Sequence, residues 1–567
     1  MVTDNKPSLV TINVDGVEHQ VPAGANLVDA LGKIGKEVPH YCYHPKLPVA
    51  GNCRMCLVEL GSPMRDRATN EVVMENGKPK IGWQPKPAIA CATNVSPGLH
   101  VRLESPGVKA CREGVTEMLL LNHPLDCPIC DQAGECKLQE FSAEYGRGYS
   151  RYLDEKNAKP KKTRLGPRVT LDDERCILCS RCVRFSSEIA KDPVLGFVNR
   201  GSFNTLTCFP GRELDNNYSL NTVDICPVGA LTSTDFRFQQ RVWFLTETPS
   251  ICTGCGRGCN MEIGARGDTI YRQTPRDNND VNSTWMCDSG RLDFHFVNSE
   301  FRLTDPMVKT AGKHQIANWK TALSTTAEAL RGLKGSEIAI IASGRLTNEE
   351  LFFVKHLAKQ LGTENVDIIP RTGGADNYLR ADDLNPNTNG AKLILGIEPG
   401  SKLAQIQENM SRGLIRGVLA LGENLLKVGF AQRDLEKVPF IATLHLLANA
   451  SAELSHVVLP GTAYAEKRGS MINVTGRLQR LNKAVKAPGN ARDTWEILRD
   501  LIVALGGSNG LHSVDDVFKR LTAEVPALNG LTFSKIGDLG TQVIETQEKI
   551  PLLEREKERK AKGIIVG

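Results

Sequence analysis

The chain has 567 residues, a formal net charge of +5, 41% hydrophobic residues and 5% aromatic residues. So small a charge on so long a chain does not indicate nucleic-acid binding, and no segment reaches the roughly 18 apolar residues of a membrane-spanning helix. The first residues, MVTDNKPS, lack the apolar stretch of a signal peptide. We therefore expect several domains in a protein that is soluble or meets a membrane only through partners.

The 17 cysteines all precede residue 288. In a chain without an export signal, clustered cysteines indicate metal or redox sites rather than disulfides. Fifteen of them and one histidine form four groups of four, which suit iron–sulfur clusters because soft donors converge on one site. The first group is Cys42, Cys53, Cys56 and Cys91, the second His123, Cys127, Cys130 and Cys136, the third Cys176, Cys179, Cys182 and Cys226, and the fourth Cys252, Cys255, Cys259 and Cys287.

Residues 1–100 are predicted to form a β-grasp ferredoxin-like domain. Residues 10–14 and 17–21 alternate as strands around Asp15-Gly16, a hairpin signal. One helix face follows, formed by Leu27, Ala30, Leu31 and Ile34. The first group resembles the plant-type [2Fe–2S] pattern with a longer first gap, and Gly51 is expected to let the backbone approach the inorganic sulfide. A zinc knuckle is the alternative.

Residues 101–150 carry the second group on a predicted helix and the loop before it. Three cysteines within ten positions lack a fourth, and His123 lies four positions before the first of them. We predict that His123 completes a [4Fe–4S] site, where a neutral imidazole in place of an anionic thiolate should raise the reduction potential. Residues 147–168 are polar and basic and are predicted to be a solvated linker.

Residues 151–245 are predicted to be a ferredoxin-like domain with one [4Fe–4S] cluster. Two-cluster ferredoxins repeat a run of four cysteines, and the fourth cysteine of each run binds the other cluster. Here Ser186 takes the fourth position of the first run, and the second run survives only as Cys226-Pro227. By this crossover rule Cys226 completes the third group. Cys208 is either a remnant ligand or a buried apolar residue, and Cys111 is expected to be a structural thiol.

Residues 246–300 carry the fourth group, predicted to hold a [4Fe–4S] cluster. Gly254, Gly256 and Gly258 alternate with its ligands, as expected where backbone crowds a cluster. Four thiolates are also a zinc site, so zinc remains an alternative here.

The sequence pattern is different in residues 301–567, where apolar strand-like runs alternate with helical patterns. Strands are predicted at 337–342, 393–397 and 418–421, and Thr347 with Glu350 forms a capping box that opens a helix. This pattern is typical of an α/β domain with a largely parallel sheet. The charged residues 554–562 are predicted to be an exposed helix or tail. The whole chain is thus expected to be a multidomain α/β and α+β protein.

The order of these motifs over residues 1–300 resembles the large iron–sulfur G subunit of NADH-quinone oxidoreductase, respiratory complex I. The fourth group and the C-terminal part resemble molybdopterin oxidoreductases, best over residues 457–460 and at Glu466, Gly469, Asn473, Arg477 and Gln479. That superfamily ends in a cofactor-capping barrel, but only 88 residues follow Gln479, and no cysteine after Cys287 is left to bind molybdenum. We expect a shortened, degenerate domain without molybdopterin.

The resemblance implies an electron relay, with one [2Fe–2S] and three [4Fe–4S] clusters and no complete substrate site on this chain. Electrons from NADH would arrive from the flavin of a partner subunit, enter at the first group, pass to the third and then the second, and leave to a downstream iron–sulfur subunit and a quinone-site subunit. The fourth group would lie off this path. The implied location is the cytoplasmic side of the bacterial inner membrane, peripheral and reached through partners.

Four basic residues next to ligands are candidates for raising cluster potentials by their charge: Arg54, Lys137, Arg181 and Arg257. Ordinary solvent exposure is the alternative for each of them.

Three other functions share parts of this pattern. The catalytic subunit of an NAD-linked molybdenum formate dehydrogenase would keep both ferredoxin clusters and a full molybdenum domain. An iron hydrogenase would need further cysteines after residue 300, where the chain has none. A zinc-stabilised interaction module would contain no iron or acid-labile sulfide. No Gly-rich dinucleotide motif follows a predicted strand, so no dinucleotide site is placed on this chain.

Overall fold

The computed structural model describes residues 8–508 and 510–565, which divide into two compact units. The first unit contains the chain up to Trp243 together with the segment from Arg555 onward, and the second is Phe244–Glu554. No helix among the described residues is long and apolar enough to cross a membrane. The finer division into five domains remains a prediction.

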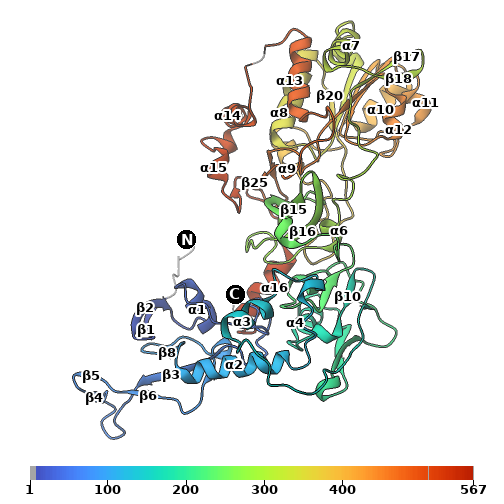
Figure 1. The fold of residues 1–567 in the computed structure, drawn as a ribbon. Helices are drawn as coiled ribbons and strands as arrows, with labels where there is room; N and C mark the ends of the chain where they lie inside the picture. The colour runs from blue at the N-terminus through green and yellow to red at the C-terminus, as the bar shows by residue number, and fades with distance from the viewer. Residues whose placement is uncertain (1–7, 509, 566–567) are drawn as a thin grey trace. The chain divides into compact units, whose positions relative to one another are not determined.

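The N-terminal part of the first unit is a mixed sheet with one helix against it (Figure 1). Asp15 and Gly16 adopt φ of 49° and 90° in the tight turn between the first two strands, so the predicted hairpin is confirmed. The predicted helix is confirmed as α1 (Leu27–Lys33), whose buried face packs on the sheet. The sheet, in order β2-β1-β8-β3-β6 with β7 also paired to β3, consists of β1 (Leu9–Val14), β2 (Val17–Pro22), β3 (Leu57–Pro63), β6 (Ile81–Trp83), β7 (Ala88–Ile89) and β8 (His100–Arg102).

The rest of the first unit consists of short elements joined by long loops, and these loops carry the predicted ligands. The hairpin β4 (Met74–Glu75) and β5 (Lys78–Pro79) extends from the N-terminal sheet region. The helices are α2 (Pro106–Leu120), α3 (Lys137–Tyr145), α4 (Arg181–Arg184), which continues as a π-helical turn over Phe185–Ile189, and α5 (Asn221–Asp224). The strands form two small sheets, β9 (Thr163–Arg164), β10 (Val169–Leu171) and β13 (Leu231–Ser233), and β11 (Leu195–Val198) with β12 (Thr205–Cys208).

The predicted linker 147–168 is mostly irregular and exposed, but it is tied to α2 rather than freely solvated. Arg151 forms a bidentate pair with Glu117 on α2, at 2.8 and 2.7 Å. The Lys156 ammonium donates to the carbonyls of Leu120 and Leu121 at 2.7 and 2.6 Å, where the end of α2 leaves carbonyls without helical partners. The segment is therefore exposed, as predicted for a solvated linker, but hydrogen bonds and ion pairs hold it against α2.

The second unit begins with an antiparallel sheet of β14 (Thr246–Ile251), β15 (Asn260–Arg266) and β16 (Thr269–Pro275), followed by the short helix α6 (Asp288–Arg291). Its main sheet has seven strands in the order β18-β17-β23-β22-β21-β19-β20. The pairs from β20 to β23 are all parallel, and β17 and β18 add an antiparallel edge. These strands are β17 (Met307–Thr310), β18 (Lys313–Ile316), β19 (Ile338–Ala342), β20 (Asn365–Ile368), β21 (Gly417–Leu421), β22 (Phe440–His445) and β23 (Val457–Pro460).

Helices cover both faces of this sheet, so its central strands are buried on both sides. In β19, Ile340 packs into one core and Ile341 into the other. The predicted α/β domain and the strands at 337–342 and 418–421 are thereby confirmed. The helices are α7 (Trp319–Arg331), α8 (Asn348–Leu361), α9 (Thr388–Leu395), α10 (Leu403–Ser411), α11 (Gln432–Leu435), α12 (Ala450–Leu454), α13 (Thr494–Ala504), α14 (Val514–Glu524) and α15 (Phe533–Ile536), and a small sheet is formed by β24 (Gly469–Ile472), β25 (Arg477–Leu481) and β26 (Thr541–Gln542).

The predicted strand at 393–397 is wrong. Residues 393–395 form the last turn of α9, Gly396 ends the helix with a left-handed φ of 70°, and Ile397 follows it. A short apolar run fits a buried strand and a buried helical turn equally well.

The charged C-terminal segment, predicted to be an exposed helix or tail, is the helix α16 (Pro551–Ala561), and it is not wholly exposed. Glu556 is buried and pairs with Lys46 at 3.3 Å, and Arg559 donates to the carbonyl of Glu188 at 2.9 Å.

Candidate metal-cluster sites

The structure brings the four cysteines of the first group together. They lie in the loop between α1 and β3 and in the short turn Ala90–Ala92. Hydrogen bonds join Cys42 to Cys53 and Cys91, and Cys91 to Cys56. Because Cys42 and Cys56 accept these bonds, the pKa values of their thiols fall, while those of the donors Cys53 and Cys91 rise.

Gly51, in the first-group loop, has a left-handed backbone and packs closely against a side chain. Its φ is 62°, and a Cβ there would lie 2.9 Å from the Ile89 side chain. The backbone conformation and the packing against Ile89 thus account for this glycine.

The second group lies outside the predicted helix, in the loop that joins α2 to α3. Its three thiols interact electrostatically with one another, and Cys130 and Cys136 are buried. Burial lowers the pKa of His123 to about 4, so the imidazole is neutral at pH 7, as a ligand must be. The charged neighbours of its ring include Asp126 and Arg175. Its role as fourth ligand remains a prediction.

The third group encloses a cavity of about 20 Å³ that all four of its thiols line. Burial raises the pKa of Cys176 to about 12 and that of Cys179 to about 11. Leu178 and Ser180, between these cysteines, adopt left-handed φ of 55° and 63°. The backbone N–H groups of Leu178 and Arg181 hydrogen-bond to the sulfurs of Cys176 and Cys179. N–H groups that donate to these sulfurs would stabilise them as anionic ligands.

The fourth group lines a cavity of about 270 Å³ in the second unit. The N–H of Gly254 donates to Cys252 Sγ at 3.4 Å, and that of Gly290 donates to Cys287 Sγ at 3.3 Å. A Cβ on Gly290 would lie 3.0 and 3.1 Å from those two sulfurs. Glycine keeps the thiols accessible here, which fits a bound cluster.

Two of the glycines between the fourth-group ligands are also required by close packing against other parts of the unit. A Cβ on Gly256 would lie 2.4 Å from Val474, and one on Gly258 would lie 2.5 Å from Gln479. Gly254, by contrast, would place its Cβ 3.5 Å from Cys252 Sγ.

The third group contacts the second through the chain next to its ligands. Lys137, which follows Cys136, donates its N–H to the carbonyl of Pro227, which follows Cys226, at 3.1 Å. A Cβ on Gly229 would lie 2.4 Å from Cys130 Sγ. Both contacts therefore bring the chain next to the third-group ligand Cys226 against the second group.

The third group also contacts the first. The Arg184 guanidinium donates to the Cys42 carbonyl at 2.5 Å, and Asn52 donates to the Leu178 carbonyl at 3.3 Å. The three groups of the first unit are therefore neighbours, with the third in contact with both others.

A buried phenol supports cluster binding in this unit. Tyr41 is fully buried, its hydroxyl has no hydrogen-bond partner among the described residues, and burial together with the nearby Cys136 and Cys53 sulfurs raises its pKa. A buried hydroxyl without a partner is costly, and a cluster sulfur beside it would supply an acceptor. In the part of the chain that the structure describes, no set of three or more His, Cys, Asp or Glu side chains is arranged to hold a single metal ion. Thiolate and imidazole donors are the ligands that iron–sulfur clusters take, and zinc takes the same donors.

The four candidate tuning residues differ in exposure. Arg54 and Lys137 are exposed, so solvent screens their charge. Arg257 is buried and donates to the Leu379 carbonyl at 2.8 Å, and Arg181 is half-buried beside third-group thiols. The sequence pattern missed Arg184, which no ligand motif marks.

The two cysteines outside the groups have ordinary surroundings. Cys208 lies on β12, where its thiol donates to the Leu165 carbonyl at 3.3 Å. Cys111 lies half-buried on α2.

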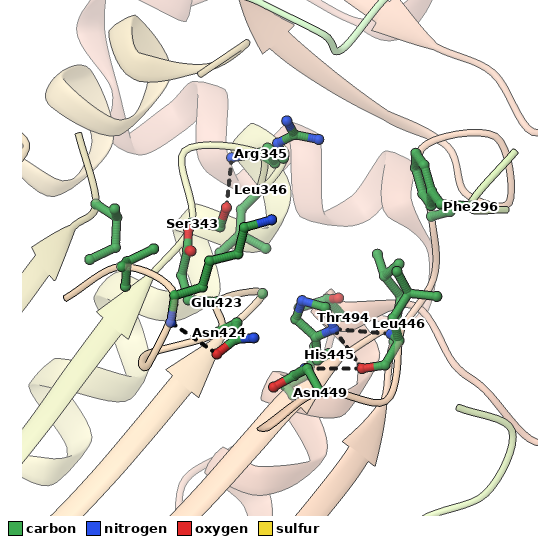
Figure 2. Close-up of a pocket in the computed structure, with 18 of the residues that line it drawn as sticks. Phe296, Ser343, Arg345, Leu346, Glu423, Asn424, His445, Leu446, Asn449 and Thr494 are labelled. Atoms are coloured by element: carbon green, nitrogen blue, oxygen red, sulfur yellow. Dashed lines mark hydrogen bonds between the residues drawn. The ribbon is translucent and has the colours of Figure 1, made fainter. Parts of the chain in front are cut away.

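A crevice of about 890 Å³ opens at the carboxyl ends of the parallel strands of the second unit (Figure 2). Strand order reverses between β19 and β21, the usual position of ligands in open α/β sheets. Ser343 after β19, Glu423 after β21 and His445 at the end of β22 line it. Two of its cations are already paired, Arg371 with Glu423 and Lys467 with Glu350.

Five family models match successive parts of the chain, and the first four matched segments each contain ligands of one group. They are the 2Fe-2S iron-sulfur cluster binding domain (8–106), the NADH-ubiquinone oxidoreductase-G iron-sulfur binding region (112–151), the ferredoxin-like domain of NADH-quinone oxidoreductase subunit 3 (166–232), the molybdopterin oxidoreductase Fe4S4 domain (245–299) and molybdopterin oxidoreductase (302–378 and 384–504).

Curated relatives carry related names. The NADH-quinone oxidoreductase G subunit of Rickettsia felis is 39% identical over 360 residues, 64% of this chain and 50% of that protein. The chain thus spans about half the length of the first curated relatives it matches. The mitochondrial NADH-ubiquinone oxidoreductase 78 kDa subunit of Neurospora crassa is 31% identical over 93% of this chain and 85% of its own length.

Among solved structures, a chain of an NAD+-reducing [NiFe]-hydrogenase matches 41% of this chain and 91% of its own length, with 28% identity and a TM-score of 0.33. The identity and coverage of the curated relatives are what establish the family. The chain belongs to the family formed by the G subunits of NADH-quinone oxidoreductases and their mitochondrial 78 kDa counterparts.

Proposed function

We propose that this chain is the electron-relay subunit of an NADH:quinone oxidoreductase. The observation that carries the proposal is the contact of the third ligand group with both the first and the second inside one compact unit. A relay needs neighbouring centres, and loops held by direct hydrogen bonds keep their spacing fixed.

The proposed cofactors are one [2Fe–2S] cluster at the first group and [4Fe–4S] clusters at the second, third and fourth groups. Bound clusters carry electrons one at a time. The chain's own residues supply thiolates and the His123 imidazole, exclude water by burial and direct N–H groups at the sulfurs, such as those of Gly254 and Gly290. Hydrogen bonds to cluster sulfurs, burial and nearby charge set the potentials.

The proposed route enters at the first group, passes to the third and leaves at the second. The contacts Arg184–Cys42 and Lys137–Pro227 support this order, since they link the first group to the third and the third to the second. The fourth group is proposed to lie off the route, as the family resemblance implies.

The proposed partners are a flavoprotein subunit that oxidises NADH, a downstream iron–sulfur subunit and a quinone-site subunit. Membrane contact through those partners, on the cytoplasmic side of a bacterial inner membrane, follows from the same proposal. No complete substrate site is assigned to this chain.

The test is co-purification from membranes with quantified metal. The expected result is a complex that contains flavin, in which this chain accounts for about 14 iron and 14 sulfide, and the iron of the downstream iron–sulfur subunit is counted in addition. Stoichiometric zinc in place of four iron atoms would overturn the fourth-group assignment. A preparation without iron would overturn the whole proposal.

The crevice in the second unit favours one other candidate, a molybdenum-dependent formate dehydrogenase subunit, because the molybdopterin oxidoreductase model covers that part of the chain. We propose that no molybdopterin binds there. Arg371 and Lys467 are neutralised by their own carboxylate partners, and no cysteine lines the crevice in the described part of the chain. One molybdenum atom per chain, or formate oxidation by the purified subunit, would instead support the dehydrogenase.

A further inference from the structure

Two arginines on α4 reach across from the third ligand group to the first. Arg181 and Arg184 flank Cys182 and lie one helical turn apart. Arg184 donates from its guanidinium to the carbonyls of Cys42, at 2.5 Å, and of Pro48, both in the first-group loop. Its Nε also donates to Ser180 Oγ, next to the third-group ligand Cys179, at 3.2 Å. A single planar group thus holds both ligand loops.

Arg181 repeats the arrangement. It donates to the carbonyl of Tyr43, which follows Cys42, and to that of Ile225, which precedes Cys226, at 3.1 Å for the latter. Together the two guanidinium groups donate to three carbonyls of the first-group loop, and to the carbonyls of Cys179 and Ile225 at or next to third-group ligands.

Neither arginine forms an ion pair with a carboxylate in the described part of the chain. Sulfurs of both groups interact electrostatically with Arg184, those of Cys179 and Cys182 in the third group and of Cys42 and Cys91 in the first. Those that interact with Arg181 belong to Cys179, Cys226 and Cys42. As ligand thiolates, the cysteines of both groups would supply the charge balance that a carboxylate supplies elsewhere.

We infer that Arg184, assisted by Arg181, is a positioning residue that fixes the spacing between the first and third clusters and raises the reduction potentials of both. A half-buried positive charge favours the reduced, more negative form of each nearby cluster, because the surroundings screen it less than water would. A charge shared by two centres shifts both in the same direction. The inference rests on the proposed cluster content, and it is independent of quinone reduction.

The test is a redox titration of the purified complex, followed by electron paramagnetic resonance, on Arg184→Gln and Arg181→Gln. At a fixed ambient potential, the ratio of reduced to oxidised cluster should fall about tenfold at both the first and third centres in Arg184→Gln, which is about 59 mV for a one-electron couple. Arg181→Gln should shift both in the same direction. The second centre should not move.

Arg54→Gln is the matched control, since it removes a positive charge next to the ligand Cys53 but from an exposed position. It should leave both potentials unchanged. Arg184→Lys separates charge from anchoring. Lysine keeps the charge but loses the planar fork, so potentials should stay close to those of the parent chain while the magnetic interaction between the reduced first and third centres weakens.

Unchanged potentials in Arg184→Gln, or a shift confined to the third centre, would overturn the inference. If Arg184→Gln assembles without clusters, Arg181→Gln and Arg184→Lys decide. Unchanged potentials in Arg181→Gln, together with an unchanged magnetic interaction in Arg184→Lys, would overturn the inference. Absence of the first and third signals from the parent complex would instead overturn the proposed function.

Discussion

Single residues next to the thiols are as informative as the thiols themselves. Gly229 is three positions beyond the third-group ligand Cys226, yet a Cβ there would meet Cys130 Sγ of the second group at 2.4 Å and Gln132 at 3.0 Å. Contacts below 3.0 Å require a neighbour to move, and the neighbour here is a proposed ligand. Glycine at this position thus leaves room for the adjacent ligand group rather than for its own.

In Gly229→Ala the second group should therefore lose its cluster, and the third group should keep its own. We expect the iron content to fall by about four atoms per chain, with loss of the second cluster's resonance signal and of electron transfer to quinone. Metal analysis of the assembled complex provides the measurement.

Gly114→Ala is the control for that substitution. Gly114 lies inside α2, and a Cβ there meets no atom within 4 Å. Alanine in a helix interior should stabilise the chain by about 0.5–1 kcal/mol and leave iron content unchanged. Full iron content in Gly229→Ala would show that the Cys130 loop relaxes freely.

The ligand groups could be predicted because cysteine spacing is a local signal that sequence displays directly. Arg184, Tyr41 and Gly229 could not, because each acts on a group far along the chain. Arg184 reaches Cys42, which lies 142 positions earlier. No local pattern marks such a residue, and only the fold shows its partner.

The start of α8 shows what a capping box does in a buried setting. Thr347 accepts from the N–H of Glu350, and Glu350 accepts from that of Thr347, so the predicted box is confirmed. Glu350 also pairs with the buried Lys467 at 2.6 Å. Glu349 beside it is fully buried and accepts from the N–H and hydroxyl of Ser470 at 2.9 and 2.6 Å, with no cation paired to it among the described residues.

Burial raises the pKa of Glu349 to about 7, so this carboxyl should make the second unit less stable as pH rises. Between about pH 4.5 and 7 the folded chain holds a proton that the unfolded chain releases, so the unfolding free energy falls across this window. Glu349→Gln removes the ionisation. We expect the variant to gain roughly 3 kcal/mol over the parent chain between about pH 5 and pH 8, measured as the difference in unfolding of the second unit.

Glu350→Gln makes the same chemical change one residue later and should act in the opposite direction. It leaves Lys467 buried without its partner, which costs roughly 3–5 kcal/mol. Equal pH dependence in Glu349→Gln and the parent chain would show that Glu349 is ionised in the folded chain.

Local signals predicted elements where periodicity was long and failed where it was short. The capping box and the fourteen residues of α8 left little ambiguity. The predicted strand 393–397 covers only five residues, too few to distinguish a strand from a helical turn. It also includes the glycine that ends α9. The second group was placed on a helix and the loop before it, and the structure places all four residues in the loop between α2 and α3, because the sequence does not show that α2 ends before His123.

Across the whole molecule, the arrangement of three contacting groups in one unit predicts series behaviour. A series relay fails when any one centre is missing, whereas a side branch does not limit flux. The fourth group belongs to the other unit and is proposed to lie off the route. Loss of a centre on the route and loss of the fourth centre should therefore have different consequences.

His123→Ala should abolish or severely lower NADH:quinone activity, while NADH:ferricyanide activity persists because that reaction draws electrons upstream at the partner flavin. Cys255→Ala should lower stability or assembly and leave the rate per assembled complex nearly unchanged. Both activities are measured on assembled complex and normalised to flavin, with Gly114→Ala as the control for purification. Normal quinone reduction in the His123 variant would show that its cluster is off the route or held by another residue. A complete loss in a fully assembled Cys255 variant would place the fourth cluster on the route, since only a centre in series stops the flow of electrons when it is removed.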